Sequence, residues 1–585
     1  MNFFKSFLSS CLGTIVALVA VTILGIILVS ALAAADEVTT IDEQSVLVLN
    51  LNGPITELEL DDPIADLIPE ASDRSMGLLQ LTGAIRHAKE DSKIEGILLN
   101  TAMVGAGYAS IEELREALID FKTSGKWIIA YSDAYSEGAY YLSSVADKIF
   151  LNPNGLLEFN GLSAEVMFFK RLFDKLEIRP EVFRAGQFKS AVEPFIREDL
   201  SAENDLQLRE LLGSIHQQMI LSIAADRKID TAQLEKISKG MLVREATDAV
   251  THKLVDSLLY EDQMHDVLRS RIGLDKDEKI SFVKYSAYRS SYEQKSESKS
   301  EIAVIVADGS IMPGKADNGV VGSKTINDAL RRARTSDRVK AVVLRINSPG
   351  GSFTASDDMW REIQLTSKEK PVIASMSDYA ASGGYFLAMA CDTIVARPTT
   401  ITGSIGVFSV MFDLSGLLNN KIGITTDEVK TGDFGNMFTV TRPLTEEEKN
   451  IWQKQTERVY KIFTGKAASG RGMKEEDLEK IASGRVWSGT QALENNLVDV
   501  LGGMNDAVRI AAASASLGDD YRLRFYPKPK TFIEKLMSGA EMEVFAADPL
   551  EKLAGPEEKI LLRQWKRLQE YGGIQARMPV EFNIH

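Results

Sequence analysis

The sequence predicts an α/β protein in which one unit occurs twice, behind a single N-terminal transmembrane helix. Three observations lead to this prediction. An uncharged apolar run occupies residues 11–35, and motifs from the first half of the remaining chain recur in the second half. Within each half, short β-branched runs alternate with helical patterns, which is typical of α/β folds with largely parallel sheets.

The composition supports a large globular protein. The chain has 585 residues, 44% of them hydrophobic and 26% charged, and its net charge is −16. This acidic balance argues against binding the phosphate backbone of a nucleic acid. Its two cysteines, Cys11 and Cys391, are too few for a disulfide framework or a zinc cluster built from CxxC pairs. We therefore predict no structural metal.

The apolar run predicts a membrane anchor within residues 1–39. About 20 apolar residues are enough for a helix to cross a bilayer. Lys5 precedes the run and Asp36 and Glu37 follow it, so the short N-terminus should stay in the cytoplasm and the rest should be exported. A cleaved signal peptide is the alternative, because Ala31-Leu32-Ala33 fits a cleavage site. The run is longer than the roughly 7–15 residues of signal peptides, which favours the anchor.

An internal duplication organises the rest of the chain. Ser132-Asp133 recurs as Ser377-Asp378, an offset of 377 − 132 = 245, and Leu254-Val255-Asp256 recurs as Leu497-Val498-Asp499, an offset of 497 − 254 = 243. Such an offset over more than 100 residues indicates a repeat. We predict one repeat over 40–295 and another over 296–550, joined by a Ser-, Lys- and Glu-rich linker at about 285–300.

Periodicity places the main elements of the second repeat. Apolar runs at 302–306, 341–346 and 372–374 predict buried strands, and 326–334 predicts a helix between the first two. The amphipathic run 444–465 predicts a long helix, with a counterpart at 201–224 in the first repeat. In the 551–585 tail, Leu561, Leu562, Trp565 and Leu568 have helical spacing, so we expect a docking helix there.

A glycine doublet marks the first candidate functional turn. Gly350-Gly351 follows a predicted strand and precedes a helical pattern. Such a turn can expose backbone N–H groups at a helix N-terminus and hold an oxyanion, although it can also be only a tight turn. The corresponding stretch of the first repeat, residues 102–106, lacks the doublet, so only one repeat needs it.

Two serines lie in further glycine-rich turns of the second repeat. Ser382 occurs in Ala-Ser-Gly-Gly and Ser404 in Thr-Gly-Ser-Ile-Gly. Serine beside glycine is usually a turn or capping residue. Glycines on both sides of Ser404 nevertheless leave its hydroxyl accessible, as a nucleophile requires. The first repeat has Glu158 or Phe159 at the matching position, and neither could replace a serine nucleophile.

Lys189 shows the opposite asymmetry. The segment Gly186-Gln187-Phe188-Lys189 aligns with Gly432-Asp433-Phe434-Gly435, so the lysine has no counterpart in the second repeat. A single lysine is usually a solvated surface charge. Here Phe188 precedes it and Ala191-Val192 follows shortly after, which favours partial burial.

The scarcity of histidine selects the base. The second repeat contains no histidine before His585, which argues against a Ser-His-Asp triad within it. A serine nucleophile needs a base, and lysine is the remaining common choice. Its pKa must fall by about 3 units, or roughly 4 kcal/mol, for the amine to be neutral near pH 7. Our hypothesis is a split dyad of Ser404 and Lys189, with one residue from each repeat.

Taken together, these motifs resemble the signal peptide peptidase A family in its long bacterial form. The resemblance covers residues 40–550 and rests on five stretches, at 188–195, 347–351, 381–385, 402–406 and 486–489. It implies the Clp-protease/crotonase fold, built from repeated ββα units. It also implies Ser404 as nucleophile, Lys189 as general base, and Gly350 or Gly351 as the oxyanion donor. By spacing, the hydroxyl that short forms place near the lysine would fall on Thr425 or Thr426.

The resemblance further implies a biological setting. The protein would be a single-pass enzyme of the bacterial inner membrane facing the periplasm, would need no cofactor, and would degrade cleaved signal peptides as a homotetramer. Turnover of other envelope peptides fits the same residues. The remaining alternatives are a crotonase-like acyl-CoA enzyme, which an exported location disfavours, and an inactive scaffold of the same fold.

Overall fold

The computed structural model describes residues 13–14, 17–19, 22, 40–59, 76–292, 298–316, 319–527 and 573–578. Across these ranges, no helix is both long and apolar enough to cross a bilayer. The anchor predicted at 11–35 lies almost wholly outside the described residues and stays a prediction. The helix expected around Leu561–Leu568 also lies outside them.

The first half is built around a parallel six-stranded sheet in the order β10-β1-β4-β6-β7-β9. Helices α3 and α4 cover one face through a cluster of buried aliphatic side chains, and α11 packs on the other face. The bounds are β1 Ser45–Asn50, α3 Leu78–Glu90, β4 Ile94–Asn100, α4 Tyr108–Lys122, β6 Trp127–Tyr135, α5 Glu137–Ser143, β7 Lys148–Leu157, α8 Ala202–Arg227, α9 Thr231–Lys239, α10 Ala246–Thr251, β9 Ser257–Leu258, α11 Glu261–Ile272 and β10 Phe282–Lys284.

The second half repeats this order of elements. Its main sheet runs β20-β18-β16-β14-β11-β22, with β17 beside β16 and β21 beside β17, and the duplicated α/β fold is therefore confirmed. The bounds are β11 Glu301–Asp308, α13 Ser323–Thr335, β14 Val339–Ser348, α14 Phe353–Ser367, β16 Val372–Ala381, α15 Gly383–Ala388, β17 Thr393–Ala396, β18 Ile401–Gly403, α16 Glu446–Arg471, α17 Glu475–Ile481, β20 Val486–Ser488, α18 Gly489–Glu494, β21 Val500–Leu501, α19 Met504–Ser514 and β22 Arg522–Tyr526.

Two details differ from the sequence prediction. The linker expected from about residue 285 begins later, because Tyr285–Ser290 forms helix α12, with Tyr285 and Tyr288 buried in the first-half core. The long helix predicted at 444–465 is α16, which continues to Arg471. Ala467 and Ala468 extend its buried face by another turn, and Gly472 ends the helix in a left-handed conformation.

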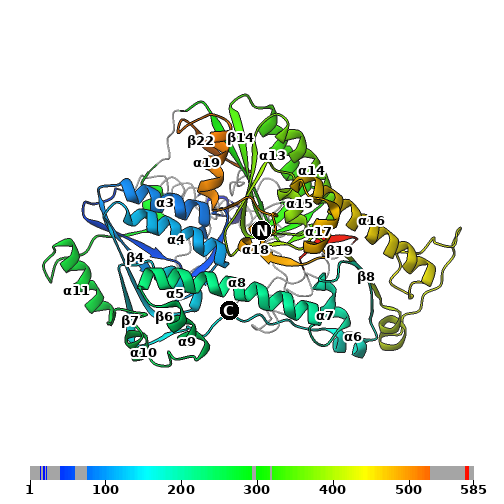
Figure 1. Ribbon diagram of the computed structural model, residues 1–585, viewed down its shortest axis with the longest axis horizontal. Coiled ribbons are helices and arrows are strands. Elements are labelled where there is room, and N and C mark those ends of the chain that lie inside the picture. Colours follow the sequence, from blue (N-terminus) through cyan, green and yellow to red (C-terminus); the bar gives the residue numbers. More distant parts are fainter. Residues whose placement is uncertain are drawn as a thin grey trace, which may run out of the picture.

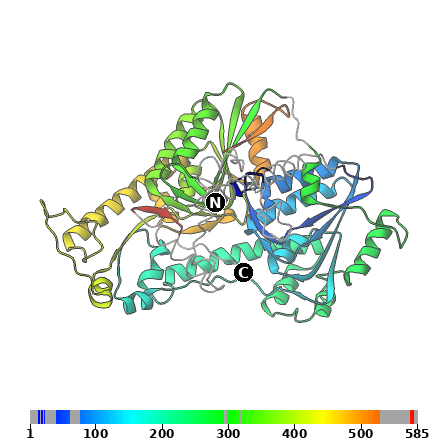
Figure 2. The same cartoon turned by 180° about the vertical axis from the view of Figure 1, so that it is seen from behind.

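A third sheet joins the halves, in the order β13-β12-β15-β23-β19-β8. Strand β8 (Arg179–Ala185) belongs to the first half and pairs antiparallel with β19 (Val407–Asp413) of the second half. The segment with β8, α6 (Lys170–Leu176) and α7 (Glu193–Ile196) lies beneath the second half, and β8 packs against α16 (Figures 1 and 2). The remaining strands of this sheet are β12 Ser310–Met312, β13 Val320–Gly322, β15 Gly350–Ser352 and β23 Gln575–Arg577.

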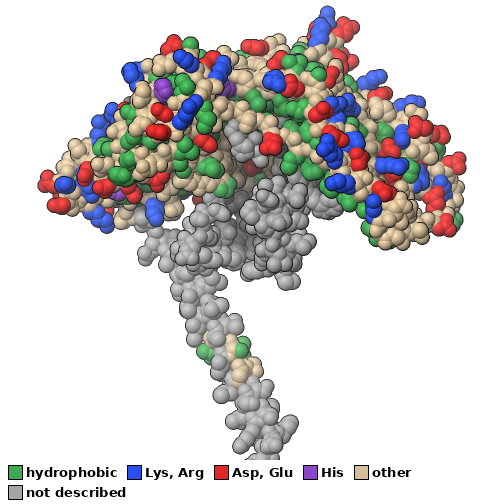
Figure 3. All heavy atoms as spheres, turned by 90° about the horizontal axis from the view of Figure 1, so that it is seen from below, with side chains coloured by type: hydrophobic (Ala, Val, Ile, Leu, Met, Phe, Trp, Pro, Cys, Tyr) green, Lys and Arg blue, Asp and Glu red, His purple; other side chains and the backbone are tan. Residues whose placement is uncertain are grey.

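Strand β23 lies within the predicted tail, but the residues whose spacing predicts the tail helix, 561–568, lie outside the described residues. At Gln575–Arg577 the chain is extended, because its backbone pairs with β15 on one side and with β19 on the other. Figure 3 views the molecule from below and shows acidic, basic and hydrophobic side chains interspersed over both ends of this face. Such mixing does not build a strong field of one sign.

Candidate active site

Lys189 lies on the first-half segment that reaches the second half. It follows β8 by a few residues, and its side chain is fully buried. The adjacent Phe188 N–H donates to the backbone oxygen of Ser483 at 2.9 Å. Gly484 must be glycine here, since its φ is +84° and an added Cβ would lie 2.6 Å from the backbone nitrogen of Lys189. The close approach of the two backbones therefore fixes the lysine against the other half.

Ser404 and Ser382 each follow a strand of the second-half sheet. Ser404 comes directly after β18 and Ser382 directly after β16. Both have positive φ, 51° and 55°, and both are fully buried. Strained backbone of this kind persists where the surroundings hold it, often at functional sites. Here the Ser404 N–H donates to Arg485 O at 2.7 Å, and the Ser382 N–H donates to Gly403 O at 2.8 Å.

The three side chains meet at the lysine amine. Lys189 Nζ lies 2.9 Å from Ser404 Oγ, 2.8 Å from Ser382 Oγ and 3.0 Å from the Ser404 carbonyl oxygen. Burial alone lowers the pKa of Lys189 well below its usual 10.5. In the described part of the chain, no carboxylate forms an ion pair with this amine. A neutral amine beside a serine hydroxyl can act as its base.

The glycine doublet lies next to this cluster. Gly350 and Gly351 have φ of +99° and +155°, and an added Cβ at Gly350 would come within 2.7 Å of the Gly383 nitrogen. The turn predicted to hold the oxyanion thus touches the turn that carries Ser382. In the present structure the Gly350 N–H donates to Ser348 Oγ at 3.2 Å. The choice between Gly350 and Gly351 as oxyanion donor stays a prediction.

The hydroxyl beside the lysine comes from Ser382, so the expectation for Thr425 or Thr426 is wrong. Both threonines are exposed, in a segment of the second half without regular secondary structure. Spacing along the chain pointed to them because it cannot tell which strands end at the same edge of a sheet. In the sequence, the turn of small residues around Ser382 is the one signal that marks this serine.

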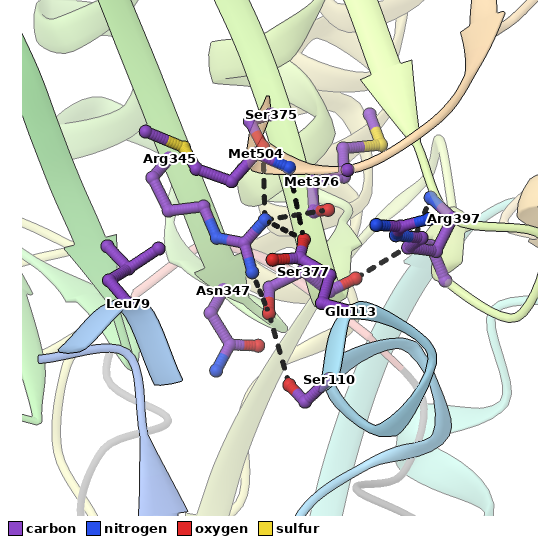
Figure 4. A network of polar contacts seen from close by, with 12 residues as sticks. Leu79, Ser110, Glu113, Arg345, Asn347, Ser375, Met376, Ser377, Arg397 and Met504 are labelled. Carbon is purple, nitrogen blue, oxygen red and sulfur yellow. Dashed lines mark hydrogen bonds and ion pairs between the residues drawn. The ribbon is translucent and has the colours of Figure 1, made fainter. Parts of the chain in front are cut away.

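A buried ion cluster between the halves was not predicted. Arg345 on β14 is fully buried and donates from Nε to Glu57 Oε2 at 2.7 Å and from Nη1 to Glu113 Oε1 at 2.6 Å. It also donates to the hydroxyls of Ser375 and Ser377 on β16, as Figure 4 shows. One second-half cation therefore holds two first-half carboxylates and the strand that leads to Ser382.

The same strand also caps a first-half helix. Helix α4 begins after Gly107 and has no side-chain cap of its own. Asp378 of β16 supplies one, since its carboxylate accepts from Ser110 N–H at 2.8 Å, from Ser110 Oγ at 2.7 Å and from Gly107 N–H at 3.1 Å. Together with Arg345, this contact sets the position of the carboxyl end of β16 relative to the first half.

No candidate metal centre occurs among the residues that the structure describes, because none of their His, Cys, Asp and Glu side chains form a group of three or more. The described site therefore consists of hydroxyls, one amine and backbone N–H groups. These groups suit acyl transfer to a serine.

Comparisons with known proteins agree with this chemistry. The model of "Peptidase family S49" matches residues 120–275 and 364–518, one segment in each half, and the model of "Clp protease" matches residues 295–401. "Protease 4" of Haemophilus influenzae is 35% identical over 490 residues, which cover 81% of this chain and 79% of the relative. "Protease 4" of Salmonella typhi is 36% identical, covering 86% and 83%. "Serine protease SPPA, chloroplastic" of Arabidopsis thaliana is 33% identical, covering 90% and 77%.

Proposed function

The chain belongs to peptidase family S49, whose members are serine peptidases, and we propose that it hydrolyses peptide bonds with a Ser404–Lys189 dyad assembled from its two halves. The observation that carries the proposal is the 2.9 Å distance from Lys189 Nζ to Ser404 Oγ, between two side chains that are both fully buried. Ser404 acts as nucleophile and Lys189 as general base.

The hydrogen bonds around Lys189 define how the proton moves. A neutral amine has two N–H groups and one lone pair. The N–H groups donate to Ser382 Oγ and to the Ser404 carbonyl, at 2.8 and 3.0 Å. The lone pair then faces the Ser404 hydroxyl. Ser382 is thus a positioning residue that fixes the orientation of the base.

The reaction then follows acyl-transfer chemistry. Lys189 takes the hydroxyl proton as Ser404 Oγ attacks the scissile carbonyl, and backbone N–H groups at Gly350 or Gly351 stabilise the oxyanion. The protonated Lys189 gives its proton to the leaving amine as the peptide bond breaks. Water, activated by the same amine, releases the acyl group and restores Ser404.

We further propose that the substrates are cleaved signal peptides and other envelope peptides, handled by an enzyme anchored in the bacterial inner membrane and facing the periplasm. The support is the apolar run at 11–35, with its charge flanks. A second support is a relative named "Putative signal peptide peptidase SppA" from Enterococcus faecium, 30% identical over 249 residues.

We also propose a homo-oligomer, with a tetramer as the expected state. Within the chain, β8 of the first half pairs with β19 of the second half. The repeat offset places their counterparts near residues 424–430 and 162–168, which form no strands in the described structure. Val429 in the first of these segments is fully exposed. Pairing of these segments between copies would repeat the internal contact around a closed ring, and analytical ultracentrifugation tests it.

Substitution of each dyad residue tests the enzymatic proposal. Ser404→Ala and Lys189→Ala should each lower kcat for an apolar peptide by at least about 100-fold, the typical contribution of a positioned base. Ser382→Ala should lower kcat less, since it only orients the amine. Ser143→Ala is the matched control, because Ser143 is a fully buried first-half serine whose hydroxyl has no hydrogen-bond partner among the described residues. Full activity of a folded Ser404→Ala or Lys189→Ala protein would exclude the dyad.

A further inference from the structure

Gln207 of helix α8 joins the two halves through its side-chain amide. The side chain is buried, with an exposed fraction of 1%. Its nitrogen donates to the Phe188 carbonyl oxygen of the first half at 3.2 Å, and its oxygen accepts from the Val486 N–H of strand β20 in the second half at 3.3 Å. One side chain therefore bridges two backbone segments that belong to different halves.

The two bridged peptide groups adjoin the two residues of the dyad. The Phe188 carbonyl belongs to the peptide bond that leads into Lys189. The Val486 N–H shares its peptide bond with the Arg485 carbonyl, and that carbonyl accepts from the Ser404 N–H at 2.7 Å. The amide thus contacts the peptide group of the lysine directly and reaches the backbone of the serine through one intervening peptide group.

The bridge needs a side chain that both donates and accepts. A carbonyl oxygen only accepts a hydrogen bond and a backbone N–H only donates one, and the two ends of the Gln207 amide match them. The amide nitrogen also lies 2.9 Å from both Ser190 Oγ and Asn204 Oδ1. Asn204 Nδ2 in turn donates to the buried Glu193 carboxylate at 3.1 Å. A connected buried network of this kind rigidifies the structure around it.

Comparison of the repeats associates this amide with the active site. Helices α8 and α16 begin at the matching N-caps Ser201 and Thr445, an offset of 445 − 201 = 244. Gln207 then corresponds to residue 207 + 244 = 451, which is Ile451. The second repeat thus lacks the amide, just as it lacks a counterpart of Lys189. A role in the shared fold would be expected in both copies, whereas a role in a single active site needs only one.

We propose that Gln207 is a positioning residue for the dyad, and that its amide keeps Lys189 Nζ within hydrogen-bond distance of Ser404 Oγ by bridging the backbones around them. This inference rests on the proposed peptidase function. The amide contacts backbone groups, Ser190 and Asn204, so it acts through the placement of the lysine. A shift of about 1 Å in a catalytic group can lower the rate about 100-fold.

Substitution of Gln207 tests this proposal. Gln207→Met fills a similar volume but has no N–H to donate to the Phe188 carbonyl. The rate at which a fluorophosphonate probe labels Ser404 in the full chain should therefore fall at least about tenfold. Gln217→Met, at an exposed position on the same helix, is the matched control and should label at the wild-type rate.

The pH profile of labelling distinguishes positioning from loss of fold. Burial lowers the pKa of Lys189, so a lysine released from its place regains water and its pKa rises. The midpoint of the labelling rate should therefore move up by about 1 pH unit in Gln207→Met. A partly unfolded population would lower the rate without moving this midpoint, and that result would overturn the proposal.

Gln207→Glu is the second variant, because it keeps the size of the side chain and an acceptor for the Val486 N–H. Its carboxylate offers no donor to the Phe188 carbonyl, so labelling should slow. The added negative charge favours the protonated lysine, so the midpoint should again rise. A wild-type rate and midpoint in either folded variant would overturn the proposal.

A double-mutant cycle separates this inference from the dyad itself. Because Gln207 acts through Lys189, Gln207→Met should lower the labelling rate no further in a Lys189→Ala background. Equal losses in both backgrounds would show that Gln207 does not act through the lysine. Labelling of Lys189→Ala at the wild-type rate would refute the dyad. Slow labelling of Lys189→Ala together with wild-type labelling of Gln207→Met would refute only the positioning role.

Discussion

At the scale of single residues, the differences between the two repeats are what identify the candidate active-site residues. Ser404 and Lys189 each lack a counterpart in the other repeat, and the absence of histidine near Ser404 pointed to an amine base. The structure brings these two side chains together. Ser382 could not be assigned from sequence, because its contact with Lys189 depends on where β16 and β18 end side by side.

The buried amine predicts how activity depends on pH. Burial stabilises the neutral form of Lys189 and lowers its pKa, and only the neutral form accepts a proton from Ser404. Below that pKa the amine is protonated and inactive, so kcat/KM should rise with pH along a limb whose midpoint lies well below 10.5. A pH–rate profile measures it, and a midpoint at the ordinary lysine value would contradict a buried base.

The stability of the protein should follow the same titration. The folded-state pKa of Lys189 is lowered, so protonation favours the unfolded chain. Wild type should therefore gain stability relative to Lys189→Met as the pH rises from the folded pKa toward 10.5. Urea unfolding at several pH values measures this difference, and a difference that does not change with pH would contradict the lowered pKa.

At the scale of elements, periodicity predicted the strands and helices within each half but not the pairings between them. Strands β8 and β19 pair over seven residues, from Val407 opposite Ala185 to Asp413 opposite Arg179, although they lie in different repeats. Strand β23, in the tail, was not predicted, because it forms by pairing with β15 and β19, which lie far away in the sequence. Neither pairing leaves a signal within its own segment.

The cap of α4 gives a prediction at this scale. An alanine Cβ at Gly107 would lie 2.4 Å from Asp378 Cγ, which displaces the carboxylate from three hydrogen bonds. Gly107→Ala should therefore destabilise the protein by about 1–3 kcal/mol. Gly213→Ala is the control, because this exposed glycine inside α8 has open space around it and alanine should stabilise the helix by about 0.5–1 kcal/mol. Urea unfolding measures the free energy of unfolding of both variants. Equal values for Gly107→Ala and Gly213→Ala would show that the Asp378 cap does not stabilise α4.

At the scale of the whole molecule, the two halves form one site because a buried cluster fixes their relative position. The sequence alone predicted that both halves contribute to the active site, since the first half has Lys189 and the second half has Ser404. It gave no indication of Arg345, whose partners Glu57 and Glu113 lie more than 200 residues away in the chain. A lone arginine within a buried strand has no local pattern that identifies its acidic partners.

Removal of Arg345 should disrupt this assembly. Arg345→Met leaves Glu57 and Glu113 buried without their cation, which typically costs about 3–5 kcal/mol. Activity should fall together with stability, because Lys189 and Ser404 come from the two halves that the cluster holds together. Arg332→Met, at an exposed position on α13, is the control and should change stability by less than about 0.5 kcal/mol. Equal unfolding curves for the two variants would show that the cluster does not hold the halves together.

The central claim is that the first half supplies the base for a nucleophile in the second half. Labelling of the full chain with a fluorophosphonate probe, followed by digestion and mass spectrometry, tests it most directly. The account predicts a covalent adduct on Ser404 that is lost in a folded Lys189→Ala variant. An adduct on Ser382, or labelling of Ser404 that persists unchanged without Lys189, would contradict it.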